Sequence, residues 1–259
     1  MRAVLLVGHG SLRTGSGAAM IRLAARARAA GLAPIAGAGF LNYSRPTFAE
    51  ALARCVAQGA AEVVVQPYFL VPGKFVRVDL PRMLKASQAA HPTVALRLAE
   101  PFGDHPALAE LVLKRAAEAG DSTMKRKRPT ERTGLLLMAH GSPDPRSNQP
   151  IEAVAERVRA AGRYAHVVVC FMELNEPSVA DAIDALAAQG VRWLIAVPFF
   201  LQLGGHVVED LPAIVAEACT RHPTTPIALA GHLAYDPLLL SVIADRVAEA
   251  LTAPQMSQR

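Results

Sequence analysis

The sequence predicts an α/β protein made of two tandem homologous lobes, each a parallel sheet flanked by helices, with a cleft between the lobes. Three observations favour this fold class. The chain repeats itself at an offset of 131 residues, which aligns AVLLVGHGS at 3–11 with GLLLMAHGS at 134–142. Short apolar runs alternate with helical patterns in each half. A polar, basic stretch, DSTMKRKRPTERTG, separates the two halves.

The repeat sets the expected boundaries along the chain. The same offset, without a gap, superposes PYFL at 67–70 on PFFL at 198–201 and Asp-Leu-Pro at 79–81 on 210–212. The basic run Lys125–Arg128 lies in the separating stretch and is expected to be solvated. We therefore expect a first lobe at 1–123, a linker at 124–133, a second lobe at 134–252 and a frayed tail at 253–259.

Each half alternates strands and helices. Continuous apolar runs of strand length are typical of parallel strands that are buried on both faces. Such strands are expected at 3–8, 34–40, 62–70 and 94–99, and again at 135–139, 165–172, 192–201 and 226–230. Helices are expected at about 17–31, 77–90, 148–162 and 208–221, with Pro46 and Pro177 opening a second helix in each half and a last helix closing it. Ligands of such sheets bind at the carboxyl ends of the strands.

Composition narrows the function classes. Of the 259 residues, 52% are hydrophobic and 19% charged, which excludes a disordered protein. The net charge of +5 suits an anionic ligand without requiring nucleic acid, and 5% aromatic residues argue against a base-stacking surface. Three cysteines cannot form an even disulfide framework, which favours a reducing, cytoplasmic location. No segment approaches the roughly 18 apolar residues of a membrane helix, so no membrane partner is expected.

Three strand ends in the second half carry residues suited to metal ligation or acid–base chemistry. His140 follows the first strand, Glu173 follows the second, and His206 lies in the loop after the third. The carboxyl ends of parallel strands share one edge of a sheet, so these side chains are expected to converge. Two imidazoles and a carboxylate form an open site for a divalent first-row metal.

The repeat supplies an internal control for this site. His9 stands at the position of His140, but Asn42 replaces Glu173 and Phe75 replaces His206. Phenylalanine cannot bind a metal, so the first half retains at most a remnant, His9. The active site is therefore expected in the second half.

These motifs resemble the class II sirohydrochlorin chelatases in their long, two-module form. The resemblance rests on GHGS and AHGS after the first strands, FMELNEPS after the second, and PFFLQLGGHVVEDLP after the third, and it covers nearly the whole chain. It implies an enzyme that inserts a divalent metal into sirohydrochlorin for cobalamin or sirohaem synthesis, with Co²⁺ favoured and Fe²⁺ next. Long forms often keep the paired histidines in the first module, whereas this chain has them in the second.

The resemblance also implies roles for individual residues. His140, His206 and Glu173 would hold the metal and serve as catalytic groups, because neutral imidazole binds such ions reversibly and accepts protons. The substrate carries several carboxylates, and four basic residues of the first half are expected to bind them: Arg13, Arg45, Lys74 and Arg77. No ATP is implied, since the sequence has no GxxxxGK[ST] loop. A monomer is expected, with the two fused modules replacing a homodimer.

Two other readings of the same residues stay open. A non-catalytic metallochaperone or tetrapyrrole carrier would use the same ligands. A phosphate-ester hydrolase of the histidine-phosphatase type would need an arginine directly before the histidine, where this chain has Gly8 and Ala139. Asp79 and Asp210, each in Asp-Leu-Pro, are interpreted as residues that start a helix or fix a loop.

Overall fold

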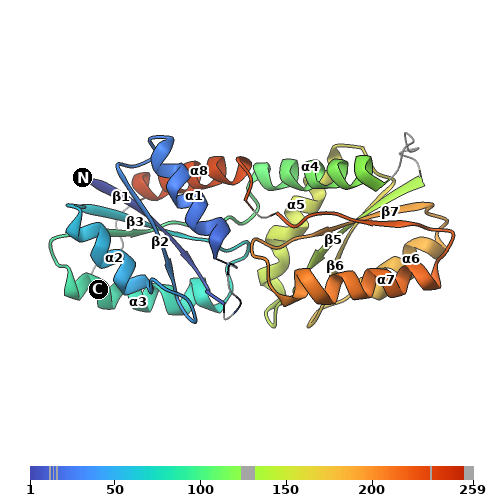
Figure 1. Cartoon of the computed structure of the whole chain (residues 1–259), viewed down its shortest axis with the longest axis horizontal. Helices are drawn as coiled ribbons and strands as arrows, with labels where there is room; N and C mark the ends of the chain where they lie inside the picture. Colours follow the sequence, from blue (N-terminus) through green and yellow to red (C-terminus); the bar gives the residue numbers. More distant parts are fainter. Residues whose placement is uncertain (12, 14, 16, 124–131, 234, 254–259) are drawn as a thin grey trace. The chain divides into compact units, whose positions relative to one another are not determined.

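Two parallel four-stranded sheets form the framework of the chain (Figure 1). The computed structural model describes residues 1–11, 13, 15, 17–123, 132–233 and 235–253, so the basic run 125–128 lies outside the described residues. Strand order is β2-β1-β3-β4 in the first sheet and β6-β5-β7-β8 in the second. This confirms the predicted α/β class, with a parallel sheet flanked by helices in each half. The strands are β1 (Arg2–Gly8), β2 (Ile35–Phe40), β3 (Glu62–Pro67), β4 (Ala95–Leu98), β5 (Thr133–Ala139), β6 (His166–Phe171), β7 (Trp193–Pro198) and β8 (Ile227–Leu229).

The central strands are buried on both faces, as their continuous apolar runs predict. All seven residues of β5 are buried, and β1 is buried from Ala3 to Gly8. The third strand of each half is shorter than expected, because β3 ends at Pro67 and β7 at Pro198 rather than at Leu70 and Leu201. Proline has no amide hydrogen for the strand ladder, so the chain leaves the sheet there.

Eight α-helices are described in the structure, four around each sheet. They are α1 (Ala18–Ala29), α2 (Phe48–Ala57), α3 (Leu80–Ala90), α4 (Pro106–Thr123), α5 (Gln149–Ala160), α6 (Val179–Ala188), α7 (Leu211–Arg221) and α8 (Leu238–Thr252). The expectation that Pro46 and Pro177 open α2 and α6 is wrong by two residues. Thr47 and Ser178 are the N-caps, because their side chains accept hydrogen bonds from the amides of Glu50 and Asp181.

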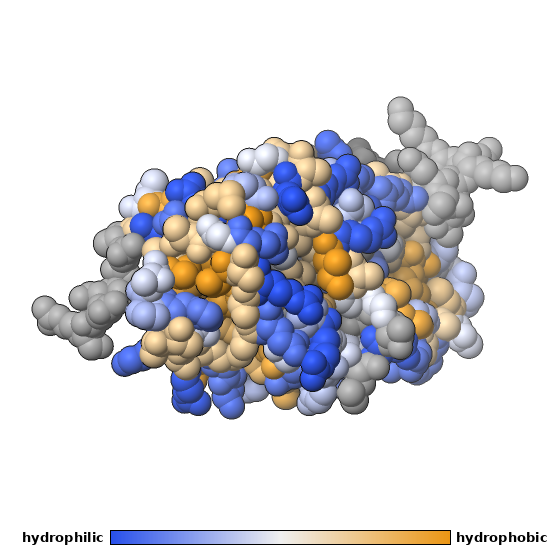
Figure 2. Space-filling view, turned by 60° about the vertical axis from the view of Figure 1, so that its left-hand side comes forward, coloured by the Kyte–Doolittle hydropathy of each residue, from blue (hydrophilic) through white to orange (hydrophobic). Residues whose placement is uncertain are grey.

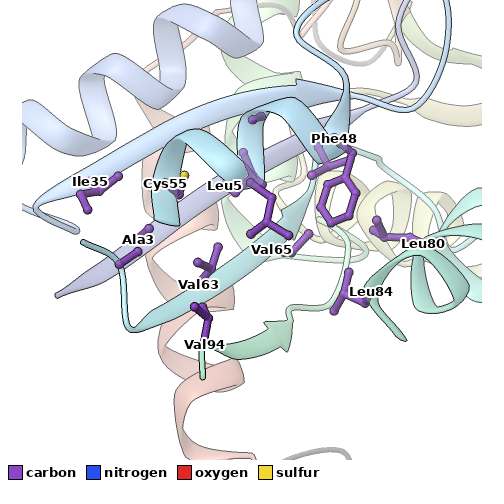
Figure 3. Packing of buried hydrophobic residues seen from close by; sticks show 14 residues of the cluster. Ala3, Leu5, Ile35, Phe48, Cys55, Val63, Val65, Leu80, Leu84 and Val94 are labelled. Atoms are coloured by element: carbon purple, nitrogen blue, oxygen red, sulfur yellow. The ribbon is translucent and has the colours of Figure 1, made fainter. Parts of the chain in front are cut away.

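One face of each sheet packs against two helices from the same half of the repeat. Figure 3 shows this core in the first sheet, where Phe48 of α2 and Leu80 of α3 pack toward Leu5 and Val65. The second sheet repeats the arrangement with α6 and α7, whose buried residues join Leu136 in one cluster. The framework that presents the strand-end loops is therefore rigid in both halves.

The other face of each sheet is covered in part by a helix from the other half of the repeat. Helix α4 packs against α5, β7 and β8, and α8 packs against α1, β3 and β4. The compact units are consequently Met1–Gly103 with Tyr235–Arg259, and Asp104–Ala234. The expected lobes, 1–123 and 134–252, follow the repeat, and the compact units depart from them in two helices, α4 and α8.

Equivalent arginines fix the two exchanged helices. Arg115 of α4 donates from Nε to the carbonyl oxygen of His232 (2.9 Å) and from Nη2 to that of Leu233 (3.3 Å). Arg246 of α8, one repeat later, donates from Nη2 to the carbonyl oxygen of Phe102 (3.0 Å). Helices α4 and α8 are repeat counterparts. Each therefore carries an apolar stripe and an arginine that suit either of the two homologous sheets.

We expect a chain that stops after residue 234 to lose the first unit and keep the second. Helix α8 buries Leu239, Val242, Ile243 and Val247, and burial of such side chains stabilises by roughly 1.5–3 kcal/mol each. The loss approaches the whole stability of a domain, about 5–15 kcal/mol. Calorimetry should show one transition instead of two, and limited proteolysis should leave a resistant fragment within 104–234.

A chain that ends after residue 253 keeps α8 and serves as the control. Protection of 1–103 in the shorter chain would show that α8 is dispensable for the first unit.

On the face drawn in Figure 2, apolar residues form small groups among hydrophilic residues. Within the described part of the chain, no helix is long and apolar enough to cross a membrane.

Candidate metal-binding site

Three neighbouring strands of the second sheet present the predicted site residues. Strand β5 lies between β6 and β7, and all are parallel, so the loops that follow them share one edge. His140 directly follows β5, Glu173 comes two residues after β6, and His206 opens a short π-helix after β7. The topology alone therefore brings the three residues to one place.

The structure brings the side chains of His140, Glu173 and His206 together. One ligand atom from each lies within 4.8 Å of the others. The two imidazole rings meet edge to face, with centroids 4.8 Å apart and planes at 74°. His140 and Glu173 are exposed and His206 is partly buried. Two nitrogens and a carboxylate oxygen at this spacing could hold a divalent metal and leave coordination positions open.

The loops that carry His140 and Glu173 are bonded to each other. The amide of Glu173 donates to the carbonyl oxygen of His140 (3.1 Å). The Oδ1 atom of Asn175 accepts from the amide of Ser142 (2.6 Å) and from Nδ2 of Asn148 (2.9 Å). Asn175 thus holds the turn after His140 against the turn after Glu173. We did not single out Asn175 from the sequence; its repeat counterpart, Ser44, makes a similar bridge to Ser11 (3.0 Å).

Gly141 is required where these loops cross. Its φ is +96°, and a Cβ atom there would overlap the carbonyl oxygen of Glu173. Leu174, next to Glu173, also has a positive φ of 67° although it is not glycine. The backbone beside two of the three site residues is therefore held in a conformation that most residues avoid.

A π-helix positions His206. The segment η4 (His206–Asp210) precedes α7, and η1 (Phe75–Asp79) precedes α3 in the same way. The sequence predicted an α-helix from 208 and did not reveal this turn. Nδ1 of His206 lies 2.8 Å from Oδ2 of Asp210. Asp210 directly precedes α7, as predicted, but its side chain makes no capping bond and contacts the imidazole instead.

The first half lacks two of the three candidate metal ligands. The His9 ring packs edge-on against Phe75 with centroids 4.4 Å apart, and it lies 5.8 Å from the ring of Tyr43. Asn42 stands where the second half has Glu173. Among the residues described, no second cluster of three histidine, cysteine or acidic side chains has such ligand spacing. His9 therefore belongs to an aromatic cluster.

The four predicted basic residues follow β1, β2 and β3, three adjacent strands of the first sheet. Arg13 lies after β1, Arg45 after β2, and Lys74 and Arg77 lie at and within η1. All four are exposed. Arg45 forms an ion pair with Glu50 (2.7 Å) while its side chain stays 82% exposed, so its charge is only partly compensated and still faces solvent.

Two further histidines have partners outside this site. Nε2 of His222 lies 2.7 Å from Oδ1 of Asp184, and this hydrogen bond holds the pKa of the Asp184 carboxyl below its usual value. Burial, and then the charge of Arg115, lower the pKa of His232. The contact with Asp184 gives His222 a structural role.

Comparison with known proteins gives one consistent family. The CbiX profile matches residues 3–119 and, separately, 134–250. A sirohydrochlorin cobaltochelatase of Priestia megaterium is 25% identical over 97% of this chain and 80% of its own length. A sirohydrochlorin ferrochelatase of the same organism is 22% identical over 98% of this chain and 92% of its own. SirB from Bacillus subtilis with Fe³⁺ has the same fold, with a TM-score of 0.84 at 22% identity, covering 97% of this chain and 96% of that one.

Proposed function

Because the CbiX profile matches both of its halves, the chain belongs to the CbiX family, and we propose that it inserts a divalent metal into sirohydrochlorin without ATP. The observation that carries the proposal is the convergence of His140, Glu173 and His206 within 4.8 Å at one sheet edge. The matched relatives named as cobaltochelatase and ferrochelatase support the same reaction.

The chemistry of insertion fits this set of side chains. The metal must shed water, and two pyrrole nitrogens must lose their protons as they bind it. Neutral His140 and His206 can hold the metal from one side, and three protein ligands bind it less completely than a closed four-ligand cage. The site can therefore release the metal to the ring. The histidines and Glu173 supply the bases for the pyrrole protons.

We further propose a division of labour between the halves. The second half holds the metal, and Arg13, Arg45, Lys74 and Arg77 of the first half bind substrate carboxylates. Co²⁺ is the favoured metal and Fe²⁺ the next, since imidazole suits both and availability decides between them. A monomer and a cytoplasmic location complete the proposal; the three cysteines are unpaired, as a reducing compartment requires.

The proposal is tested with purified protein, metal-free sirohydrochlorin and Co²⁺ or Fe²⁺ in the absence of ATP. Acceleration of the spectral change of metal insertion, at enzyme concentrations far below substrate, is the expected result. Binding of metal and ring without acceleration would instead identify a carrier. Comparing Co²⁺ with Fe²⁺ in parallel assays ranks the two metals.

Charge reversal at the first sheet should weaken substrate binding. We expect Lys74→Glu/Arg77→Glu to raise KM for sirohydrochlorin about tenfold, a change of about 1.4 kcal/mol, with little effect on kcat. The reason is that these side chains would meet carboxylates and not the metal. Steady-state kinetics at two salt concentrations measures the effect, and salt should reduce it.

The matched control is Arg28→Glu/Lys85→Glu, which reverses two exposed charges on α1 and α3. If both double variants raise KM equally, the effect is one of net charge, and the assignment of Lys74 and Arg77 fails.

A further inference from the structure

The pair His206–Asp210 is a second layer of the metal site. Oδ2 of Asp210 lies 2.8 Å from Nδ1 of His206, a hydrogen-bonding distance. The two residues are the first and last of η4, so they are four positions apart within one turn. The contact therefore comes from a local backbone feature and needs no distant partner.

The repeat allows a structural role of Asp210 to be distinguished from a role in the metal site. Asp79 ends η1 just as Asp210 ends η4, and neither side chain caps the following helix. In the first half the residue four positions earlier is Phe75, which has no nitrogen to bond. Both halves thus share the turn and the aspartate, but only the second half pairs the aspartate with an imidazole.

We propose that Asp210 is a positioning residue that fixes the tautomer and ring orientation of His206. An ionised carboxylate only accepts hydrogen bonds, so the imidazole must carry its proton on Nδ1. The Nε2 lone pair is then left free for a metal. A carboxylate behind a histidine ligand also raises the basicity of that ligand, and loss of such a partner typically lowers metal affinity roughly 10–100-fold.

The inference rests on one part of the proposed function, namely that His140, Glu173 and His206 bind a metal. His206 is partly exposed, with 36% of its side chain accessible, and its edge-to-face contact with the His140 ring does not determine which ring nitrogen faces Asp210. Glu173 has a different restraint, because its loop is bonded to that of His140. The hydrogen bond to Asp210 restrains His206, as the bonded loops restrain His140 and Glu173.

The experiment uses the full chain with ¹⁵N-labelled histidine and Co²⁺ as the only ligand. Long-range ¹H–¹⁵N spectra of the metal-free protein report the tautomer of His206, and titration followed by visible absorption reports Co²⁺ affinity. For Asp210→Asn we expect a shift toward the Nε2–H tautomer and an affinity lower by roughly 10–100-fold. The matched variant Asp79→Asn should leave both readouts unchanged, and Asp210→Glu should restore part of the affinity.

Several outcomes would overturn the role of Asp210. One is an unchanged tautomer and affinity in Asp210→Asn, and another is an equal loss in Asp79→Asn, which would indicate a shared structural role. Thermal unfolding of each variant shows whether the fold persists, and Asp210→Glu provides a second variant of the same position. If the wild-type chain fails to bind Co²⁺, the proposed function falls, while the tautomer measurement still tests the pair itself.

Discussion

Replacing His140 or His206 by alanine is expected to abolish metal insertion, with kcat/KM for Co²⁺ insertion falling by roughly 10²–10⁴-fold. Each substitution removes one of the two proposed nitrogen ligands from a site with three protein groups. The remaining imidazole and Glu173 would bind the metal too weakly to hold it beside the ring. Loss of an imidazole also removes a base that can accept a pyrrole proton. Stopped-flow absorption with metal-free sirohydrochlorin measures the rate directly.

The repeat provides the matched control for this prediction. His9 stands after the first strand of the first half as His140 does in the second, but its ring packs against Phe75. His9→Ala should therefore lower the stability of the first unit more than the rate of insertion. Full loss of activity in His9→Ala, together with an active His206→Ala, would move the site to the first half.

The strand-end positions of the triad could be predicted from the sequence because they depend on few interactions. A continuous apolar run of strand length, such as LLLMA, is typical of a central strand that is buried on both faces, and neighbouring parallel strands end at one edge. His140 and Glu173 follow two such strands closely. Their proximity therefore depends on topology alone, and the structure brings them together as expected.

Two features could not be predicted, because for each of them the sequence is compatible with two similar structures. An apolar stripe on α8 predicts a buried helix, but it cannot say which of two homologous sheets the helix covers. The five residues of η4 have no period that distinguishes a π-turn from the start of an α-helix. The position of Asp210 at the start of a helix could therefore be predicted, but its contact with His206 could not.

The restraint on the Glu173 loop could not be predicted from the sequence either. The HGS motif indicated His140 as a site residue, but in the structure its glycine, Gly141, lies where two loops cross. A single sequence shows neither the φ of Gly141 nor the carbonyl oxygen above it.

Gly141→Ala is expected to lower Co²⁺ affinity about 100-fold and to destabilise the second unit by about 2–4 kcal/mol. The methyl group would overlap the carbonyl oxygen of Glu173, so the two loops must separate and the bond from the Glu173 amide to His140 must weaken. The three ligand atoms would then no longer lie within reach of one ion. Calorimetry and Co²⁺ titration of the full chain measure the two effects.

Two other glycine-to-alanine variants separate the backbone cost of the substitution from the displacement of the Glu173 loop. Gly162 also has a positive φ, 64°, but a Cβ there meets nothing within 4 Å, so Gly162→Ala should cost only the backbone term of roughly 1–2 kcal/mol and leave Co²⁺ affinity unchanged. Gly10, the repeat counterpart, would overlap the carbonyl oxygen of Asn42, so Gly10→Ala should destabilise the first unit without affecting Co²⁺. Equal affinities in Gly141→Ala and Gly162→Ala would mean that the triad tolerates displacement of Glu173. In that case the carboxylate would not be a ligand, and the two histidines alone would hold the metal.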